Sequence, residues 1–289
     1  MVFMMYTRDN VSAKRIMEVL DTKPSIVNDK DCIQLDSIQT LCFKDVSFSY
    51  PNGEEAVLKN IDFSCHKGQK IAVIGSTGSG KSTLVKLMNR FYDVSRGSIE
   101  INGSDFRKYK KESLCKQVGY VAQMAHMFMC SIRSNICFGK PEASDEEMHH
   151  AARVAQASDF ISKRENGYLD EIAEDGTNIS GGQKLRLSIA RVILKKPSLY
   201  IYDDSFSALD FKTDATLRKA LKPEVKDAIF FVVAQRISTI MDSDMIIVLD
   251  EGQIIGLGTH LELLKNCSVY QEIAHSQLTQ KELDDYERN

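Results

Sequence analysis

The spacing of apolar residues changes from helical to strand-like within the first quarter of the chain. Helical spacing over 11–20 predicts a short amphipathic helix, and a linker follows it. Alternating apolar residues then predict two strands over 43–50 and 58–65, which flank the turn-rich segment 51–53. A globular domain is therefore expected to begin near residue 38.

Further along, short apolar runs predict the strands of a parallel sheet. These runs cover 70–74, 199–202, 229–233 and 245–249, and each is rich in residues that favour strands. The pattern from about 143 to 195 is mostly helical instead. The sequence thus predicts an α/β domain that is interrupted by a helical insert.

Composition narrows the classes of function. The chain has 289 residues, of which 43% are hydrophobic and 27% charged, as in globular proteins. Its formal charge of -3 shows no basic excess, so a nucleic-acid partner is disfavoured. Seven scattered cysteines indicate a reducing compartment rather than a disulfide framework. The sequence contains no apolar run long enough to predict a membrane-spanning helix.

A phosphate-binding loop is the strongest chemical signal. Residues 75–82 match G-x-x-x-x-G-K-[ST] and lie between a predicted buried strand and a helix start. Backbone N–H groups of such a loop face the phosphates, Lys81 reaches the β and γ phosphates, and Ser82 binds Mg²⁺. The residues expected around ATP here are Gly75, Ser76, Thr77, Gly78, Ser79, Gly80, Lys81, Ser82 and Thr83.

Two acidic residues follow the apolar run near residue 200. Asp203 ends that run, and a carboxylate in this position is the usual partner of a P-loop, where it holds Mg²⁺. Asp204 would point differently, toward the γ-phosphate. The alternative interpretation is a solvated pair of acids at a strand end.

With these motifs in place, the sequence from about 38 to 275 resembles the ABC transporter ATPases. Residues 179–183, Ile-Ser-Gly-Gly-Gln, are similar to the family's signature with isoleucine in place of leucine, and 207–210, Ser-Ala-Leu-Asp, are similar to its D-loop. Gln123 matches the Q-loop glutamine, a ligand of the metal and the nucleotide. Tyr50 matches the aromatic residue that stacks on adenine. A lone Gln or Tyr would more often be structural.

The resemblance implies a fold and a composite site. The fold would be a P-loop NTPase (RecA-like) core with an antiparallel β subdomain and a helical subdomain at about 124–190. Two such domains would close head to tail over two ATP molecules. The signature residues Ser180, Gly181, Gly182 and Gln183 would begin a helix that binds the γ-phosphate of ATP on the partner's P-loop. The resemblance also makes Asp210, in the D-loop, one of the expected nucleotide-binding residues.

The resemblance also implies a setting. Residues 1–37 look like the linker and the end of the membrane domain in exporters, so Met1 looks like a truncation point. Residues 38–275 would form the ATPase domain, and 276–289 a charged tail. The implied partners are a second nucleotide-binding domain and a transmembrane domain at the cytoplasmic face of the cell membrane, without nucleic acid.

Two positions depart from the family's active site. Asp204 stands where the family has glutamate, and Gln235 stands where it has the switch histidine. Aspartate retracts the carboxylate by about 1.5 Å, one carbon–carbon bond, and a misplacement of about 1 Å can cost about 10²-fold in rate. Glutamine cannot carry the positive charge of imidazolium. The candidate catalytic residues Lys81, Asp204 and Gln235 therefore predict a slow site.

These departures favour a heterodimeric exporter. The chain resembles the degenerate-site subunit of bacterial multidrug or lipid exporters, in which a partner with Glu and His supplies the active site. One alternative is a non-catalytic, ATP-binding regulatory subunit. Another is a soluble ABC ATPase acting on DNA, which would need a long coiled coil, and sustained heptads are absent from the sequence between the P-loop and the signature. The cargo is not encoded in these motifs.

Overall fold

The computed structural model describes residues 2–28, 31–51 and 53–278. Its strands are β1 (Thr40–Phe48), β2 (Leu58–His66), β3 (Lys70–Gly75), β4 (Arg96–Ile101), β5 (Ser104–Asp105), β6 (Val118–Val121), β7 (Leu199–Asp203), β8 (Ile229–Val233), β9 (Met245–Asp250) and β10 (Gln253–Gly258). Its α-helices are α1 (Val2–Leu20), α2 (Lys81–Met88), α3 (Lys111–Gln117), α4 (Ile132–Cys137), α5 (Asp145–Val154), α6 (Ser158–Ile161), α7 (Gly181–Lys195), α8 (Phe211–Val225), α9 (Ile237–Ile240), α10 (His260–Asn266) and α11 (Ser268–Gln277). Position 52 of the predicted turn and positions 279–289 of the predicted tail lie outside the described residues.

The central sheet is mostly parallel, as predicted. Within the described residues its strand order is β10-β9-β3-β8-β7-β6, and the neighbours from β9 to β6 are all parallel. The four apolar runs form β3, β7, β8 and β9. The edge strands β6 and β10 were not predicted, because β6 is only four residues long and glycines interrupt the short apolar sequence of β10.

The antiparallel subdomain forms a second sheet of order β2-β1-β4-β5 among the described residues. The rings of Phe43 and Phe63 stack across β1 and β2 with their centroids 4.6 Å apart. The prediction extended the first strand to Tyr50, but β1 ends at Phe48. Tyr50 therefore lies in the loop that follows, where its side chain need not alternate between the two faces of the sheet.

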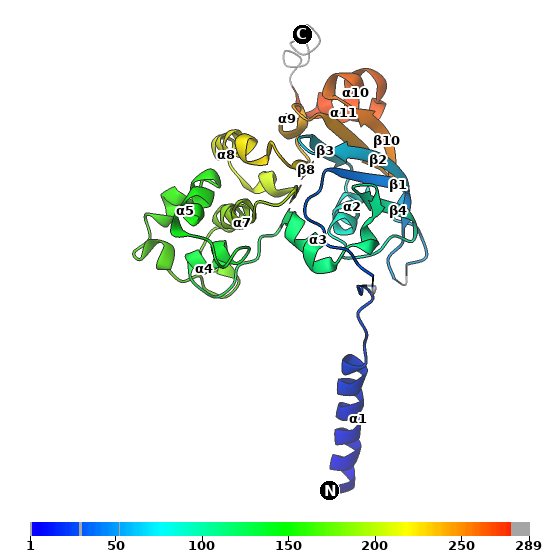
Figure 1. Ribbon diagram of the computed structural model, residues 1–289, viewed down its shortest axis with the longest axis vertical. Coiled ribbons are helices and arrows are strands. Elements are labelled where there is room, and N and C mark those ends of the chain that lie inside the picture. Colours follow the sequence, from blue (N-terminus) through cyan, green and yellow to red (C-terminus); the bar gives the residue numbers. More distant parts are fainter. Residues whose placement is uncertain (1, 29–30, 52, 279–289) are drawn as a thin grey trace.

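The parallel strands are buried on both faces, which explains their unbroken apolar sequences. In β3, Ile71 and Val73 pack on the side of the antiparallel sheet, whereas Ala72 and Ile74 pack on the side of α7 and α8. Figure 1 shows the antiparallel sheet and the helical group α4, α5 and α7 on opposite sides of the molecule. The α/β fold with two added subdomains is confirmed.

The helical segment matches the predicted region only in part. Helices α5 and α7 account for its two ends, and the residues between them form α6 and short turns. α5 begins with a capping box, in which Ser144 and Glu147 each satisfy the other's backbone N–H. Seven apolar residues of α7 are buried in the core, so this helix anchors the segment to the sheet; they are Leu185, Leu187, Ile189, Ala190, Val192, Ile193 and Leu194.

The first helix is longer than predicted. It runs from Val2 rather than from near residue 11, because residues 2–10 contain neither glycine nor proline to break it. Ile16, Val19 and Leu20, which were expected on one face, are all more than half exposed. Figure 1 shows α1 standing away from the rest of the chain. In the described part of the chain, no helix is both long and apolar enough to cross a membrane.

Candidate nucleotide-binding site

The predicted phosphate loop joins the end of β3 to the start of α2. Position 75 has no room for a side chain, because a Cβ on Gly75 would lie 2.0 Å from the carbonyl oxygen of Leu249 on the neighbouring strand. Gly80 has φ of 101°, a left-handed conformation that suits glycine, and it occupies the N-cap of α2. The local geometry thus aims the start of α2 at the loop, where anions are favoured.

Lys81 folds back over this loop. Its Nζ donates to the carbonyl oxygens of Gly75 at 2.9 Å and Ser76 at 2.6 Å. Burial lowers the pKa of the Lys81 ammonium, while the charges of Asp204 and Asp203 act to raise it. The ammonium is therefore held inside the loop, at the place where the motif predicts phosphates.

A cleft of about 390 Å³ opens beside the loop and gathers most of the predicted site residues. From the loop and α2 it is lined by Thr77, Gly78, Gly80, Lys81, Ser82 and Thr83, and from elsewhere by Val57, Gln123, Asp203, Asp204, Val233 and Gln235. Gly75, Ser76 and Ser79 also belong to the loop, but they are not among the residues that line the cleft. Residues far apart in the sequence thus share one cleft.

Asp203 is a buried carboxylate on the floor of the cleft. Only 6% of it is exposed, and its Oδ2 accepts a hydrogen bond from the hydroxyl of Tyr120 at 3.2 Å. Burial raises the pKa of the Asp203 carboxyl, and the Tyr120 hydrogen bond and the charge of Lys81 oppose this. A bound cation would relieve the cost of burying this charge.

Asp204 lies where three neighbouring strands end. Gln123 follows β6, Asp204 follows β7 and Gln235 follows β8, and these strands are adjacent in the sheet. The Oδ2 of Asp204 accepts hydrogen bonds from Nε2 of Gln235 at 2.6 Å and from Nε2 of Gln123 at 3.3 Å. Burial raises the pKa of the Asp204 carboxyl, and the hydrogen bond from Gln235 opposes this shift.

Tyr50 lies beside the loop helix. Its hydroxyl is 3.0 Å from the Thr83 hydroxyl, and its ring makes edge contacts with the rings of Phe48 and Tyr92. The Lys86 ammonium lies 5.4 Å from the ring centroid. These contacts place Tyr50 next to the phosphate loop, and its stacking on adenine stays a prediction.

The signature residues lie elsewhere. Ser180 is the N-cap of α7 and forms a capping box with Gln183, whose backbone N–H it binds at 3.3 Å. Ser180 and Gly181 are exposed, and among the described residues the lining of the cleft does not include 180–183. Asp210 is also exposed and caps α8 by accepting from the backbone N–H of Thr213 at 3.0 Å. The structure therefore separates the signature from the chain's own P-loop.

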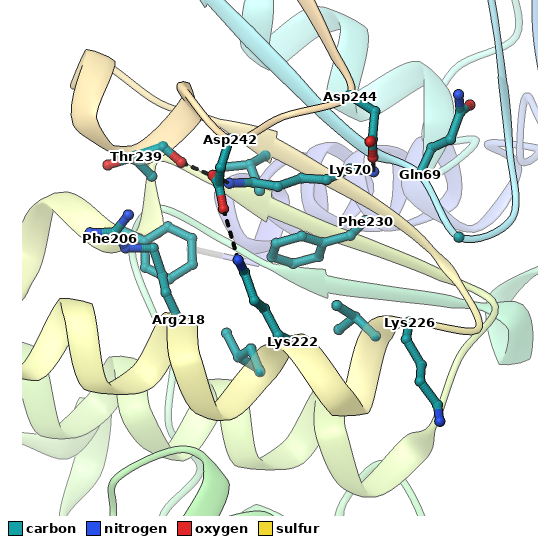
Figure 2. Close-up of a pocket in the computed structure, with 14 residues that line it drawn as sticks. Gln69, Lys70, Phe206, Arg218, Lys222, Lys226, Phe230, Thr239, Asp242 and Asp244 are labelled. Carbon is teal, nitrogen blue, oxygen red and sulfur yellow. Dashed lines mark hydrogen bonds and ion pairs between the residues drawn. The ribbon is translucent and has the colours of Figure 1, made fainter. Parts of the chain in front are cut away.

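A second cavity, of about 290 Å³, lies between α8 and the α9–β9 connection (Figure 2). The rings of Phe206 and Phe230 form part of its wall, and Lys70 of β3 and Lys222 of α8 both reach Asp242. Phe206 follows Asp204 by two positions, so this cavity borders the segment that carries the candidate base. Among the described residues, those lining it do not include the predicted phosphate-loop residues.

Comparison with known proteins identifies the family. Residues 58–207, which include the P-loop, the signature and the acidic pair, match the family model described as ABC transporter. The chain belongs to the ABC transporter family. The match covers the ATP-binding domain, and members of this family are ATP hydrolases, so the predicted family and enzyme class are confirmed.

Two similar proteins are described as multidrug exporters. The chain is 41% identical over 268 residues to the putative multidrug export ATP-binding/permease protein YgaD of Bacillus subtilis, covering 92% of this chain and 46% of that protein. A protein with a similar description from Staphylococcus aureus, SAOUHSC_02003, is 42% identical over 228 residues, which is 79% of this chain and 39% of its own. The chain thus spans about half the length of the curated relatives it matches.

A solved ABC exporter shares the fold. The structure of a bacterial Atm1-family ABC exporter with ATP bound superposes with a TM-score of 0.90 at 32% identity, covering 97% of this chain and 49% of that one. The resemblance to exporter-type ABC ATPases, predicted from the motifs and the N-terminal helix, is therefore confirmed at the level of the fold and the family.

The donors in the cleft suit Mg²⁺ bound together with a nucleotide. Mg²⁺ prefers oxygen ligands and takes one or two protein carboxylates plus phosphates and waters. The Ser82 hydroxyl, the buried Asp203 carboxylate and the side-chain amide of Gln123 are hard donors that line one cleft. The predicted metal ligands therefore lie together.

Tyr120 was missed from the sequence. It lies in the short edge strand β6, three positions before Gln123, and its hydroxyl reaches Asp203 only because β6 pairs with β7. Strand β6 was itself too short to predict, so the only available signal was the polar end of a Tyr side chain just upstream of the Q-loop.

Proposed function

We propose that this chain is the ATP-binding domain of an ABC exporter whose own P-loop site hydrolyses ATP slowly. The observation that carries this proposal is the 2.6 Å hydrogen bond from Gln235 to Asp204. It places the two departures from the family's active site in direct contact within the nucleotide cleft. Both therefore act on the same step, the activation of water beside the γ-phosphate.

Different cleft residues would have different roles in ATP binding. The loop N–H groups and Lys81 bind the phosphates, and Ser82, Asp203 and Gln123 hold Mg²⁺, which neutralises charge on the phosphates when bound. Asp204 is the acceptor for the proton of the attacking water. Burial raises its pKa above the ordinary value, which makes the carboxylate a stronger base.

Slow turnover follows from the chemistry of the two side chains. The Gln235 amide donates to Asp204 and keeps the carboxylate in place, but it supplies no positive charge to the transition state. The aspartate is also one methylene shorter than glutamate. A retraction of about 1.5 Å is enough for a rate loss of about 10²-fold.

The exposed signature supports a composite dimer. Ser180 and Gly181 lie exposed at the N-terminus of α7, a 15-residue helix whose first N–H groups favour anions. We propose that 180–183 complete the ATP site of a partner nucleotide-binding domain that carries Glu and His. In that heterodimer the partner's site is the fast one and the chain's own site holds ATP for longer.

A groove of about 440 Å³ between the core and the helical segment supports a transmembrane partner. Phe91 and Phe138 line it and are 53% and 61% exposed. Apolar surface that is exposed and gathered in one groove marks protein contacts. Tyr120 also lines this groove and donates a hydrogen bond to Asp203. A partner docked in the groove would therefore affect the position of a proposed metal ligand.

The location and the domain boundaries belong to the same proposal. With a transmembrane partner, the domain would work at the cytoplasmic face of the cell membrane. Residues 1–37 would form the connection to that partner, and 38–275 the ATPase domain, in which 124–190 form the helical subdomain. The described residues of 276–289 are the last two of α11 and its C-cap, Leu278.

The test is ATP affinity and steady-state hydrolysis of this chain. The wild type should bind ATP tightly with little turnover, and Asp204→Glu with Gln235→His should raise kcat by about 10²-fold. Lys81→Ala is the control and should abolish binding in both backgrounds. Fast turnover of the wild-type chain, unchanged by Asp204→Asn, would rule the slow-site proposal out.

The alternative is a regulatory subunit that binds ATP without hydrolysing it. The contact of Asp204 with Gln235 favours it as well, because neither side chain has the family's chemistry. Hydrolysis in the complete complex decides between the two. Slow but Asp204-dependent turnover supports the exporter site, whereas turnover that is indifferent to Asp204 at all ATP concentrations supports the regulatory subunit.

A further inference from the structure

Gln277, the last residue of α11, is bonded to two backbone groups of the segment 234–237, which contains Gln235 and is called the switch segment below. Its Nε2 donates to the carbonyl oxygen of Gln235 at 2.8 Å. Its Oε1 accepts from the backbone N–H of Ile237, also at 2.8 Å. One side chain thus holds two backbone groups of the switch segment, 42 and 40 residues away in sequence.

These two backbone groups need a partner from outside the segment. Residues 234–236 follow β8 and lie in neither a helix nor a strand. The regular hydrogen bonds of a helix or sheet therefore do not satisfy the Gln235 carbonyl. Ile237 is the first residue of α9, whose first N–H groups have no intrahelical acceptor. Arg236 at the N-cap has no side-chain acceptor to offer. Gln277 supplies what the local sequence lacks.

The position of Gln235 therefore depends on its backbone. Gln235 is exposed, so packing around the side chain does not fix it. Hydrogen bonds hold the backbone before and after the Gln235 side chain: the N–H of Ala234 donates to the Val73 carbonyl oxygen at 3.1 Å, and the Gln235 carbonyl oxygen accepts from Nε2 of Gln277. From this backbone the side-chain amide reaches Asp204.

Helix α11 gives Gln277 a fixed base. Tyr270 and Ala274 are fully buried, and the Tyr270 hydroxyl lies 2.7 Å from Nδ1 of His260 on α10. Gln271 adds a second tie, since its Nε2 donates to the carbonyl oxygen of Leu264 at 2.6 Å. The end of α11 is thus held against the body of the domain.

We propose that Gln277 is a positioning residue for the chain's own ATP site, which it serves by fixing the backbone of Gln235 so that the Gln235 amide meets Asp204. Gln277 does not line the nucleotide cleft and acts only through the switch segment. The proposal rests on the proposed function for its effect on rate. Its structural part, the placement of the Gln235 side chain, is independent of hydrolysis.

Two substitutions separate the two bonds. Gln277→Met keeps the length of the side chain and removes both bonds. Gln277→Glu keeps the acceptor for Ile237 but replaces the donor to Gln235 with an oxygen that repels its carbonyl. Gln271→Met is the matched control, because it removes a glutamine-to-carbonyl bond from the same helix without touching the switch.

The first readout is the side-chain NH₂ resonance of Gln235 in the full 289-residue chain, assigned with Gln235→Glu. The bond to a carboxylate gives this resonance a distinct shift in the wild type. Both Gln277 variants should move it toward the shift of a free amide, and Gln271→Met should not. An unmoved resonance in Gln277→Met overturns the proposal, whatever the turnover.

The second readout is the split between kcat and KM in the Asp204→Glu, Gln235→His background, where the same backbone carries the imidazole. Adding Gln277→Met should lower kcat about tenfold and leave KM within about twofold, because the phosphate loop is untouched. Equal kcat with and without Gln277→Met overturns the effect on rate. A moved resonance with no turnover in any background leaves the placement of Gln235 standing and refutes the proposed function.

Discussion

Gln235 and Asp204 are joined by a 2.6 Å hydrogen bond across 31 positions of sequence. They meet because β7 and β8 are parallel neighbours that end at the same edge of the sheet. Each residue departs from the family's active site, and each faces the other. The two substitutions therefore form one local unit rather than two independent changes.

We expect the effects of Asp204→Glu and Gln235→His on kcat to be strongly non-additive. Residues in contact couple by about 0.5–3 kcal/mol, and a coupling of about 1.4 kcal/mol is a tenfold factor. The double variant should exceed the product of the single effects by about that factor. Steady-state hydrolysis of the four proteins measures it, and single effects that simply multiply would contradict a shared role.

Ser180→Ala should destabilise the fold without weakening ATP binding. Loss of the capping box of α7 costs about 1 kcal/mol in the free energy of unfolding, whereas Ser180 lies outside the lining of the cleft. Thr259→Ala is a matched control, because Thr259 forms the same capping box with Glu262 at the start of α10. Urea unfolding and ATP titration measure both quantities.

The Ser180→Ala and Thr259→Ala variants should differ in turnover only in a complete transporter. Ser180→Ala should lower turnover at the partner's site, and Thr259→Ala should leave it unchanged. A drop in the ATP affinity of the isolated chain on Ser180→Ala would mean that the signature contacts the chain's own nucleotide.

Gly75→Ala should reduce ATP affinity by at least about tenfold, since the P-loop positions the phosphates. The new Cβ would lie 2.0 Å from the Leu249 carbonyl oxygen, so the loop must shift away from β9. Gly103→Ala is the control, since Gly103 has φ of 76° but open space around it. It should cost about 1–2 kcal/mol of stability through backbone strain alone, and ATP affinity measured by calorimetry should not change.

Acid should weaken the fold partly through Asp242. Burial acts to raise the pKa of the Asp242 carboxyl, but the hydrogen bond and charge of Lys70, with Lys222, outweigh it and lower the pKa below its usual value (Figure 2). Since the folded pKa is depressed, the stabilisation is present above the unfolded pKa of about 3.9 and is lost as pH falls through the folded value.

Asp242→Asn should therefore flatten the decline of unfolding free energy between about pH 5 and pH 3. Urea unfolding at several pH values measures the slope. The control is Asp45→Asn, which removes an ion pair with Arg96 in which both side chains are well exposed. An equal change of slope in both variants would contradict a specific role for Asp242.

The sequence by itself determined the family, the kind of fold and most of the nucleotide site. The P-loop, the signature and the acidic pair are contiguous motifs, and each contains the local chemistry that it needs. The parallel strands were also readable, because burial on both faces leaves unbroken apolar runs. Short edge strands such as β6 and β10 were not, since β6 is only four residues long and glycines interrupt β10.

Only the tertiary structure decided which of these residues meet. The order β8-β7-β6 brings Gln235 and Gln123 to one oxygen of Asp204, and the pairing of β6 with β7 brings Tyr120 to Asp203. The packing of α11 brings Gln277 to the switch backbone. Such contacts join residues tens of positions apart, and their partners are set by strand order and helix packing. The sequence pattern of a helix or strand shows its periodicity, but it does not show which other elements lie beside it.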